Sequence, residues 1–233
     1  MIKVTVWDED LQNSNQEMKK IYPDGIRAVI ADRLGMNDDF AVTQVHAQMP
    51  DMGINDEIIA NTDVLIWWAH RTHDALPDAL AEKIRDAVLG GMGFVVLHSA
   101  HLSKPFKMLM GTSCTLHYKY PDRAKVFTTC PTHPIASGIP QMFELEPEEL
   151  YGEFFDIPKP DDVVFTSWFE GGCLFRGGCT WTRGYGKIFY FHAGHDTYPT
   201  YHNPYVQKII ENAVYWAAPE QTGVKLECVK VRT

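Results

Sequence analysis

The sequence of 233 residues predicts an α/β fold, built on a doubly wound, mostly parallel sheet with added β-strands in the second half. Short apolar runs alternate with helix-like segments over the first hundred residues, a pattern typical of strand–helix–strand units with right-handed crossovers. The apolar runs are continuous rather than alternating, as expected for parallel strands that helices cover on both faces.

The first half supplies four strand candidates and three helix candidates. The strand candidates are Ile2–Trp7, Phe40–His46, Val64–Ala69 and Phe94–Leu97. The helix candidates are Ser14–Leu34, Asp56–Ala60 and a segment from Pro77 to Leu89. Pro23 breaks or kinks the first of these helices because proline has no amide hydrogen, and Gly35 stops it. Pro77 suits the first turn of the third helix, and Gly90 follows its end.

The second half has a different character. Residues 100–160 are rich in turn signals and are expected to be loop-rich. Shorter strands are expected at Val126–Cys130, Val163–Phe169, Cys179–Arg183 and Lys187–His192. Tyr185 and Gly186 suit a hairpin turn between the last two of these strands. A closing helix is expected over Asn203–Ala217, because Asn203 suits the N-cap and Pro204 the first helical position.

The chain is predicted to form one domain over residues 1–233, because no internal repeat or linker interrupts it. Residues 219–233 are expected to form a C-terminal tail. Its Val224–Val231 segment alternates like an edge strand, which would cover a sheet edge or pair between the subunits of a homo-oligomer.

Composition excludes several classes of protein. A net charge of −9 without a Lys/Arg cluster argues against a nucleic-acid partner. No apolar run approaches the roughly 20 residues of a membrane span, and the N-terminal residues do not resemble a signal peptide. The five cysteines are odd in number and form no C-x-x-C pair, which favours free thiols in a reducing compartment. We therefore expect a cytoplasmic protein with no membrane partner.

Histidines follow the predicted strands. The pairs His70/His73, His98/His101 and His192/His195 each come at or just after the end of an apolar run, and His46 ends another. In an open parallel sheet, ligands bind outside the carboxyl ends of the strands. Side chains three residues apart on a regular strand point in opposite directions, so each pair does not act as a unit. Placement at one rim of the sheet is the informative observation.

Three interpretations of this rim stay open. In the first interpretation, several of the histidines bind a divalent metal such as zinc, which takes imidazole and carboxylate ligands. Alternatively, they act as acid/base groups or as hydrogen-bond partners of a polyol, because imidazole exchanges protons near neutral pH. In the third interpretation, some are structural and bond to loop carbonyls. No G-x-G-x-x-G follows the first strand, so neither a nucleotide nor a flavin cofactor is expected.

Several downstream motifs together resemble the trehalose-utilisation ThuA family. They are GTSCTLHY (Gly111–Tyr118), HPIASGIP (His133–Pro140), EELYG (Glu148–Gly152), WTRGYGKIFYFHAGHD (Trp181–Asp196) and a closing helix that ends in YWAA. LHSAH also resembles the end of the family's fourth strand. The resemblance implies a flavodoxin-like fold of the class I glutamine amidotransferase-like superfamily and a setting in bacterial sugar metabolism.

Amidotransferase activity itself is not expected. That chemistry needs a cysteine on a sharp strand-to-helix turn with glycines around it. The corresponding segment, Leu97–His101, has neither, and Cys114 lies well downstream. Ser99 has two interpretations, as the N-cap of a following helix or as a serine nucleophile that lacks the G-x-S-x-G setting.

The predicted site combines strand-end histidines with residues of the resembling motifs. Catalytic roles are assigned to His98, Glu149, Tyr151 and His195. The candidate metal ligands are His98, His117 and His195. The candidate substrate-binding residues are His70, His101 and Asp196. The remaining rim residues are His73 and His192, which point away or support a ligand, His133, which is structural, and Asp8.

These residues predict a sugar-metabolism protein that acts on a small saccharide. The first hypothesis is a metal-assisted isomerase or hydrolase of a saccharide or keto-sugar, which moves protons next to a carbonyl or assists hydrolysis. The alternative is a non-catalytic sugar-binding or regulatory protein on an amidotransferase-like fold.

Overall fold

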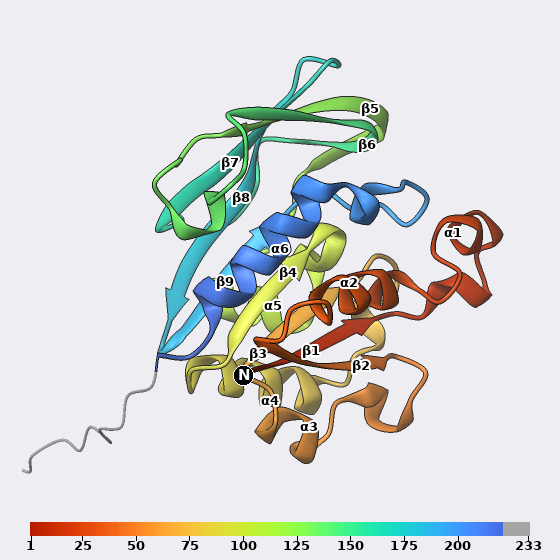
Figure 1. Ribbon diagram of the computed structural model, residues 1–233, viewed down its shortest axis with the longest axis vertical. Coiled ribbons are helices and arrows are strands. Elements are labelled where there is room, and N and C mark those ends of the chain that lie inside the picture. Colours follow the sequence, from red (N-terminus) through yellow and green to blue (C-terminus); the bar gives the residue numbers. More distant parts are fainter. Residues whose placement is uncertain (221–233) are drawn as a thin grey trace, which may run out of the picture.

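The computed structural model describes residues 1–220, which contain a nine-stranded sheet flanked by helices (Figure 1). Five strands form a parallel half, in the order β2 (Phe40–His46), β1 (Ile2–Asp8), β3 (Val64–Trp68), β4 (Gly93–Leu97) and β9 (Gly186–Phe191). Every residue of β3 and β4 is buried, which explains their continuous apolar sequence.

The sheet then continues through four antiparallel strands. In order from β9 these are β8 (Leu174–Arg183), β7 (Asp162–Phe169), β5 (His117–Thr128) and β6 (Met142–Gly152). The α/β class is confirmed. The prediction of a mostly parallel sheet is wrong, because four of the eight strand pairings in residues 1–220 are antiparallel. The flavodoxin-like description is therefore not confirmed for the sheet as a whole.

Helices cover both faces of the parallel half. The longer helices are α2 (Ile26–Leu34), α4 (Asp78–Leu89) and α6 (Pro204–Ala217); the shorter ones are α1 (Gln16–Ile21), α3 (Asp56–Ala60) and α5 (Lys104–Met110). Helix α2 packs on β1 and β2, and α6 packs beside it on β4 and β9 (Figure 1). The β1–β2 and β3–β4 crossovers run in opposite directions along the sheet. Right-handed connections therefore place α2 and α4 on opposite faces.

The predicted helix over residues 14–34 is broken into two. Helix α1 ends at Ile21 and α2 begins at Ile26, with Pro23 in the gap. Gly25 precedes α2 with φ +89°, a conformation that L side chains rarely adopt. A proline and a glycine in one short segment therefore turn the chain, where the apolar spacing alone favours one continuous helix.

The expectation of a loop-rich segment over residues 100–160 understates its regular structure. This segment contains α5, β5 and β6. Strand β6 is half-exposed, so its first residues alternate between buried and exposed side chains, and Glu144 and Glu146 occupy two of the exposed positions. A search for continuous apolar runs does not detect such a strand. The tail strand predicted at Val224–Val231 lies outside the described residues.

Several local predictions are confirmed. The bounds of β2 and α3 agree with the sequence expectation, and Asn203 caps α6 by accepting hydrogen bonds from the amides of Tyr205 and Val206. Gly93 allows close packing of β4 on α6, because a Cβ there would collide with the backbone of Ala217. No helix within residues 1–220 is long and apolar enough to cross a membrane.

Candidate functional site

A cavity of about 540 Å³ opens where the carboxyl ends of the parallel strands meet β6. Its walls come from the segments after β3, β4 and β9 and from the antiparallel half of the sheet. The lining residues are His70, Arg71, Ser99, His101, Leu102, Thr115, Leu116, Tyr118, Glu149, Tyr151 and His195. The cavity thus lies at the rim that the histidine pattern indicates, although Tyr118, Glu149 and Tyr151 come from β5 and β6, which the pattern does not include.

His98 lies at the base of this site, directly after β4. Its side chain is fully buried, and its backbone has φ +56°, a strained conformation for a residue other than glycine. His98 Nδ1 lies 3.0 Å from the carbonyl oxygen of His192, so this nitrogen carries the proton and donates it. The tautomer leaves a lone pair on Nε2, which faces Glu149.

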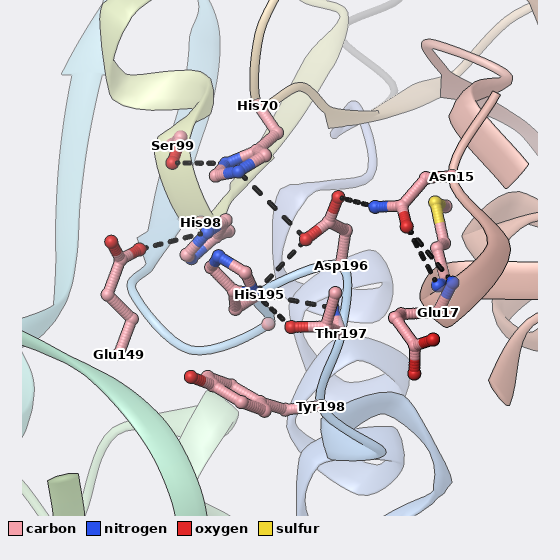
Figure 2. Close-up of polar contacts among 12 residues, drawn as sticks. Asn15, Glu17, His70, His98, Ser99, Glu149, His195, Asp196, Thr197 and Tyr198 are labelled. Carbon is pink, nitrogen blue, oxygen red and sulfur yellow. Dashed lines mark hydrogen bonds and ion pairs between the residues drawn. The ribbon is translucent and has the colours of Figure 1, made fainter. Parts of the chain in front are cut away.

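Glu149 is the acidic partner of His98. Its Oε2 lies 3.3 Å from His98 Nε2, and Figure 2 shows the two side chains pointing toward one another. Burial, reinforced by the charge of Glu148, raises the pKa of Glu149 to about 8. The carboxyl group is therefore largely protonated at neutral pH. Neither His98 Nε2 nor Glu149 Oε2 has a hydrogen bond of good geometry within the described residues.

Glu148, the preceding residue, holds β6 against the end of β9. Its carboxyl group accepts hydrogen bonds from the amides of Gly194 (3.1 Å) and His195 (3.4 Å) and from the hydroxyl of Thr200 (2.7 Å). Burial raises the pKa of Glu148 to about 7, although these donors act in the opposite direction. The sequence predicts no role for Glu148, because nothing in EELYG separates its two glutamates.

A chain of hydrogen bonds joins three cavity residues. Tyr151 OH lies 2.8 Å from Ser99 Oγ, which in turn lies 3.1 Å from His70 Nδ1. The N-cap interpretation of Ser99 is wrong, because its hydroxyl bonds to side chains and caps no helix. Tyr151 also stacks on His98, with 5.4 Å between the ring centres.

His70, His195 and Asp196 form a second group beside the first. One ring nitrogen of each histidine and one carboxylate oxygen of Asp196 lie within 4.8 Å of one another. Asp196 is fully buried, and its Oδ2 accepts hydrogen bonds from Asn15 (2.8 Å) and Arg71 (3.0 Å). Figure 2 shows both imidazoles facing this carboxylate. These distances allow the three side chains to share a cation. The sequence does not predict such a ligand role for His70 or Asp196.

The histidines of the site are uncharged at neutral pH. Burial lowers the pKa of His98 well below its usual value, and the neighbouring His70 and His195 lower it further. Burial also lowers the pKa of His70, and that of His195 to about 4, although Asp196 opposes both shifts. Neutral imidazoles can accept a proton or bind a metal ion through a free nitrogen.

Glu9 organises the segment that carries His70. Its carboxylate accepts hydrogen bonds from the amides of His70 (3.0 Å), Arg71 (2.9 Å) and Thr72 (2.7 Å), and from the Thr72 hydroxyl (2.8 Å). Glu9 is itself buried. This carboxylate therefore fixes the turn after β3. The position of Glu9 just after the first strand is the feature of the sequence that could have indicated this role. Of the acidic residues at this strand end, only Asp8 was expected at the rim.

The structure brings most predicted site residues together. His70, His101, Glu149, Tyr151 and His195 line the cavity, and His98 and Asp196 lie buried beside it.

His117 is not part of this group. It is exposed at the start of β5, opposite Gly152, and the cavity is lined by its neighbours Leu116 and Tyr118 instead. Its ring lies over Gly152, since a Cβ on that glycine would lie 3.3 Å from His117 Cδ2. Adjacent residues of a strand point to opposite faces, so Tyr118 and His117 diverge.

Three of the other rim residues have structural partners. His192 bonds to Gly177 O and Ser167 Oγ, and His133 caps a short turn by accepting a bond from the amide of Ile135. Asp8 pairs with Arg27 at 2.8 Å.

A family model described as trehalose utilisation, that of the ThuA family, matches residues 3–217. The chain belongs to the ThuA family. The resemblance of the sequence motifs is thereby confirmed over nearly the whole described chain. No curated protein matches this ThuA-family chain.

Solved structures show the same fold. A ThuA-like protein from Parabacteroides merdae has a TM-score of 0.70 at 16% identity, covering 98% of this chain and 92% of its own. Another from Bacteroides uniformis has a TM-score of 0.66 at 14% identity, covering 92% and 90%. A cytoplasmic protein from Salmonella typhimurium has a TM-score of 0.63 at 11% identity, covering 94% and 100%. At these identities the likeness concerns the fold alone.

Proposed function

We propose that this ThuA-family protein is an enzyme of saccharide utilisation that transfers a proton at a carbon next to the carbonyl group of a keto-sugar. Its family supports a general role in sugar metabolism. The observation that carries the proposal is the Glu149–His98 pair, in which a protonated carboxyl and a neutral imidazole meet 3.3 Å apart beside the cavity.

The pair has the two functions that such a reaction needs. His98 Nε2 accepts the proton as the C–H bond breaks, and the Glu149 carboxyl donates its proton to the carbonyl oxygen, giving an enediol. His98 Nε2 then returns its proton to the neighbouring carbon, while the other enediol hydroxyl gives its proton to the Glu149 carboxylate, which completes an isomerisation and restores both groups. The bond from His98 Nδ1 to the His192 carbonyl fixes the tautomer that leaves Nε2 basic.

The cavity suits a sugar in size and in charge. Its volume of about 540 Å³ lies within the range of small-molecule sites, roughly 300–1,000 Å³. The histidines of the site are neutral, and the carboxylate of Asp196 is paired with Arg71. Tyr118 and Leu116 add apolar faces beside these polar groups, a combination that suits a neutral saccharide.

Deuterium exchange tests the proposal without knowledge of the product. The untagged protein is incubated in D₂O with D-fructose, D-glucose, trehalose and trehalose oxidised to its ketone, and loss of the C–H signal next to the carbonyl is followed by NMR. We expect exchange with at least one keto-sugar. E149Q and H98N should each slow it by about 100-fold or more. Asparagine is chosen at position 98 because it tolerates a positive φ.

E146Q is the matched control, because Glu146 lies on the same strand with an exposed side chain. It should exchange at the wild-type rate. Saccharide binding without exchange or conversion for any substrate would contradict the proposal and favour the non-catalytic alternative.

A second candidate, a serine hydrolase, is favoured by one observation. Ser99 Oγ lies 3.1 Å from His70 Nδ1, and His70 Nε2 faces Asp196 Oδ1 at 4.0 Å, which is too long for a hydrogen bond. A fluorophosphonate probe separates the two functions. Labelling of Ser99, together with complete loss of activity in S99A, would support the hydrolase. Proton exchange that persists in S99A would exclude it.

A further inference from the structure

We infer that His70, His195 and Asp196 form a binding site for a divalent transition-metal ion of the zinc type, open toward the cavity. The binding itself stands on the geometry of the three residues. The role of the ion rests on the proposed function, because it would lie beside the Glu149–His98 pair.

The three side chains already lie close to ligand geometry. One donor atom from each lies within 4.8 Å of the others, and His195 Nδ1 and His70 Nε2 lie 3.1 Å and 4.0 Å from Asp196 Oδ1. Two ligands of a tetrahedral zinc ion are about 3.4 Å apart, given zinc–ligand bonds of about 2.1 Å. Small side-chain rotations therefore suffice to place an ion between them.

Asp196 presents one oxygen to this space. Asn15 and Arg71 occupy its Oδ2, whereas Oδ1 is buried and has no hydrogen-bond donor among the described residues. A buried carboxylate oxygen without a donor is costly, because it has lost water and gained no partner. An ion between Asp196 and the two histidines would compensate for that loss. The bonds to Oδ2 would orient the carboxylate as outer-shell partners do in metal sites.

The contact between His195 and Asp196 also supports a metal ion at this site. The Thr197 amide lies 3.2 Å from His195 Nδ1 and donates to it, so this nitrogen has a lone pair rather than a proton. The same nitrogen lies 3.1 Å from Asp196 Oδ1, which is also an acceptor. Two acceptors at this distance repel one another unless a positive charge lies between them. A metal cation would supply that charge and would take the Nδ1 lone pair in place of the Thr197 amide.

The ligand set indicates the kind of ion. Two imidazoles and one carboxylate suit zinc and its first-row neighbours, whereas magnesium and calcium prefer oxygen ligands. Three protein ligands leave a coordination position open, as in catalytic zinc sites. His70 and His195 line the cavity, so that position faces the space for a substrate, where the ion would polarise a sugar oxygen.

This set differs from the one that the sequence predicts. His195 is common to both. His98 Nε2 faces Glu149, and His117 is exposed outside the cavity, so the structure replaces these two ligands with His70 and Asp196.

Metal titration of the untagged, chelator-treated full chain tests the inference. Co²⁺ and Zn²⁺ are added separately as chlorides. Binding is measured by calorimetry and, for Co²⁺, by its visible absorption. We expect one ion per chain. H70A and D196N should each weaken binding by about 100-fold or more, since even outer-shell changes cost 10–100-fold. H117A should bind like the wild type.

Circular dichroism establishes whether each variant is folded. Asp196 is buried, so D196N can fail to fold. In that case H70A decides the test, because His70 is only partly buried. Wild-type protein without stoichiometric binding would overturn the inference. So would a folded H70A with unchanged affinity, or loss of binding in H117A.

The inference and the proposed function fail separately. Metal binding without any proton exchange would contradict the proposed enzyme activity and would still support the metal site. If the wild-type protein binds no metal and still exchanges protons, the metal site is contradicted and the proposed enzyme activity is supported.

Discussion

Glu148 and Glu149 are adjacent in the sequence but have different surroundings. Glu148 accepts bonds from two amides and a hydroxyl, which makes it a structural carboxylate. Glu149 lines the cavity and faces His98 at 3.3 Å. The different partners, rather than the residue type, separate a structural role from the proposed chemical one.

Replacing Glu149 with glutamine should stabilise the protein at alkaline pH. A carboxyl whose pKa rises from 4.5 to about 8 on folding favours the fold fully below pH 4.5. That contribution is lost as the pH rises through 8, where a buried charge must form. E149Q should therefore increase the free energy of unfolding by about 1–3 kcal/mol at pH 9 and change it little at pH 5.

Urea denaturation at the two pH values measures this difference. E146Q makes the same chemical change at an exposed position of β6 and should show no such pH dependence. Equal effects of E149Q at pH 5 and pH 9 would mean that Glu149 does not titrate in this range.

The same group sets the alkaline limit of the proposed activity. If Glu149 donates a proton to the carbonyl oxygen, kcat should fall as the pH rises through about 8, because the donor is lost. A pH–rate profile of the deuterium exchange measures the limit. A rate that keeps rising beyond pH 9 would exclude Glu149 as the acid.

At the scale of elements, the site depends on short segments after β3, β4 and β9. Glu9 ties down the first of them through the amides of His70, Arg71 and Thr72. It acts from the end of β1, the neighbouring strand in the sheet. The position of His70 is therefore determined by a carboxylate far from it in the sequence.

Removing this anchor should destabilise the protein. E9A leaves three amides and one hydroxyl without their acceptor, and we expect a loss of about 3 kcal/mol in the free energy of unfolding, measured by urea denaturation. E17A is the control, since Glu17 is exposed and forms a surface pair with Lys20. A loss in E9A no larger than in E17A would show that the turn holds without Glu9.

The sequence predicted elements well where local signals were strong. Continuous apolar runs located β3 and β4, and Asn203 located the start of α6. The pattern located only the last residues of β5 and missed β6, because a half-exposed antiparallel ribbon alternates and carries many charges. Its pairing partners are distant in sequence, so no local pattern reveals them.

The candidate site was predictable to a similar extent. Strand-end placement selected His98 and His195, and the EELYG motif selected Glu149, all of which the structure brings to one place. The sequence could not show that His117 lies outside the cavity, because the face on which a strand residue lies depends on pairing register. It also did not select Glu148, whose partners follow β9.

At the scale of the whole molecule, the cavity lies between two halves of one sheet. The parallel half supplies His70, His98 and His195, and the antiparallel half supplies Glu149 and Tyr151. Strands β8 and β9 pair along six residues and join the halves. The proposed acid and base therefore belong to different halves, which the β8–β9 pairing joins.

The two halves should unfold together. Because β8 and β9 pair directly and Glu148 bonds across the junction, we expect one calorimetric transition, with equal calorimetric and van't Hoff enthalpies. Fluorescence of Trp67 in the parallel half and of Trp181 in the antiparallel half, each measured in a variant that keeps one tryptophan, should give the same midpoint. Two separate midpoints would contradict the prediction of one domain.

The neighbouring glutamates also constrain how β6 can change in evolution. Since successive strand residues face opposite sides, a one-residue slip of β6 against β5 would turn each glutamate to the other face. A slip in one direction would place Glu148 at the cavity and Pro147 at the anchoring position, and a slip in the other would place Glu149 at the anchoring position and Leu150 at the cavity. Either slip leaves one of the two positions without a carboxyl group, so relatives that preserve this site should absorb length changes in the β5–β6 connection or in a bulge and keep the register of this stretch.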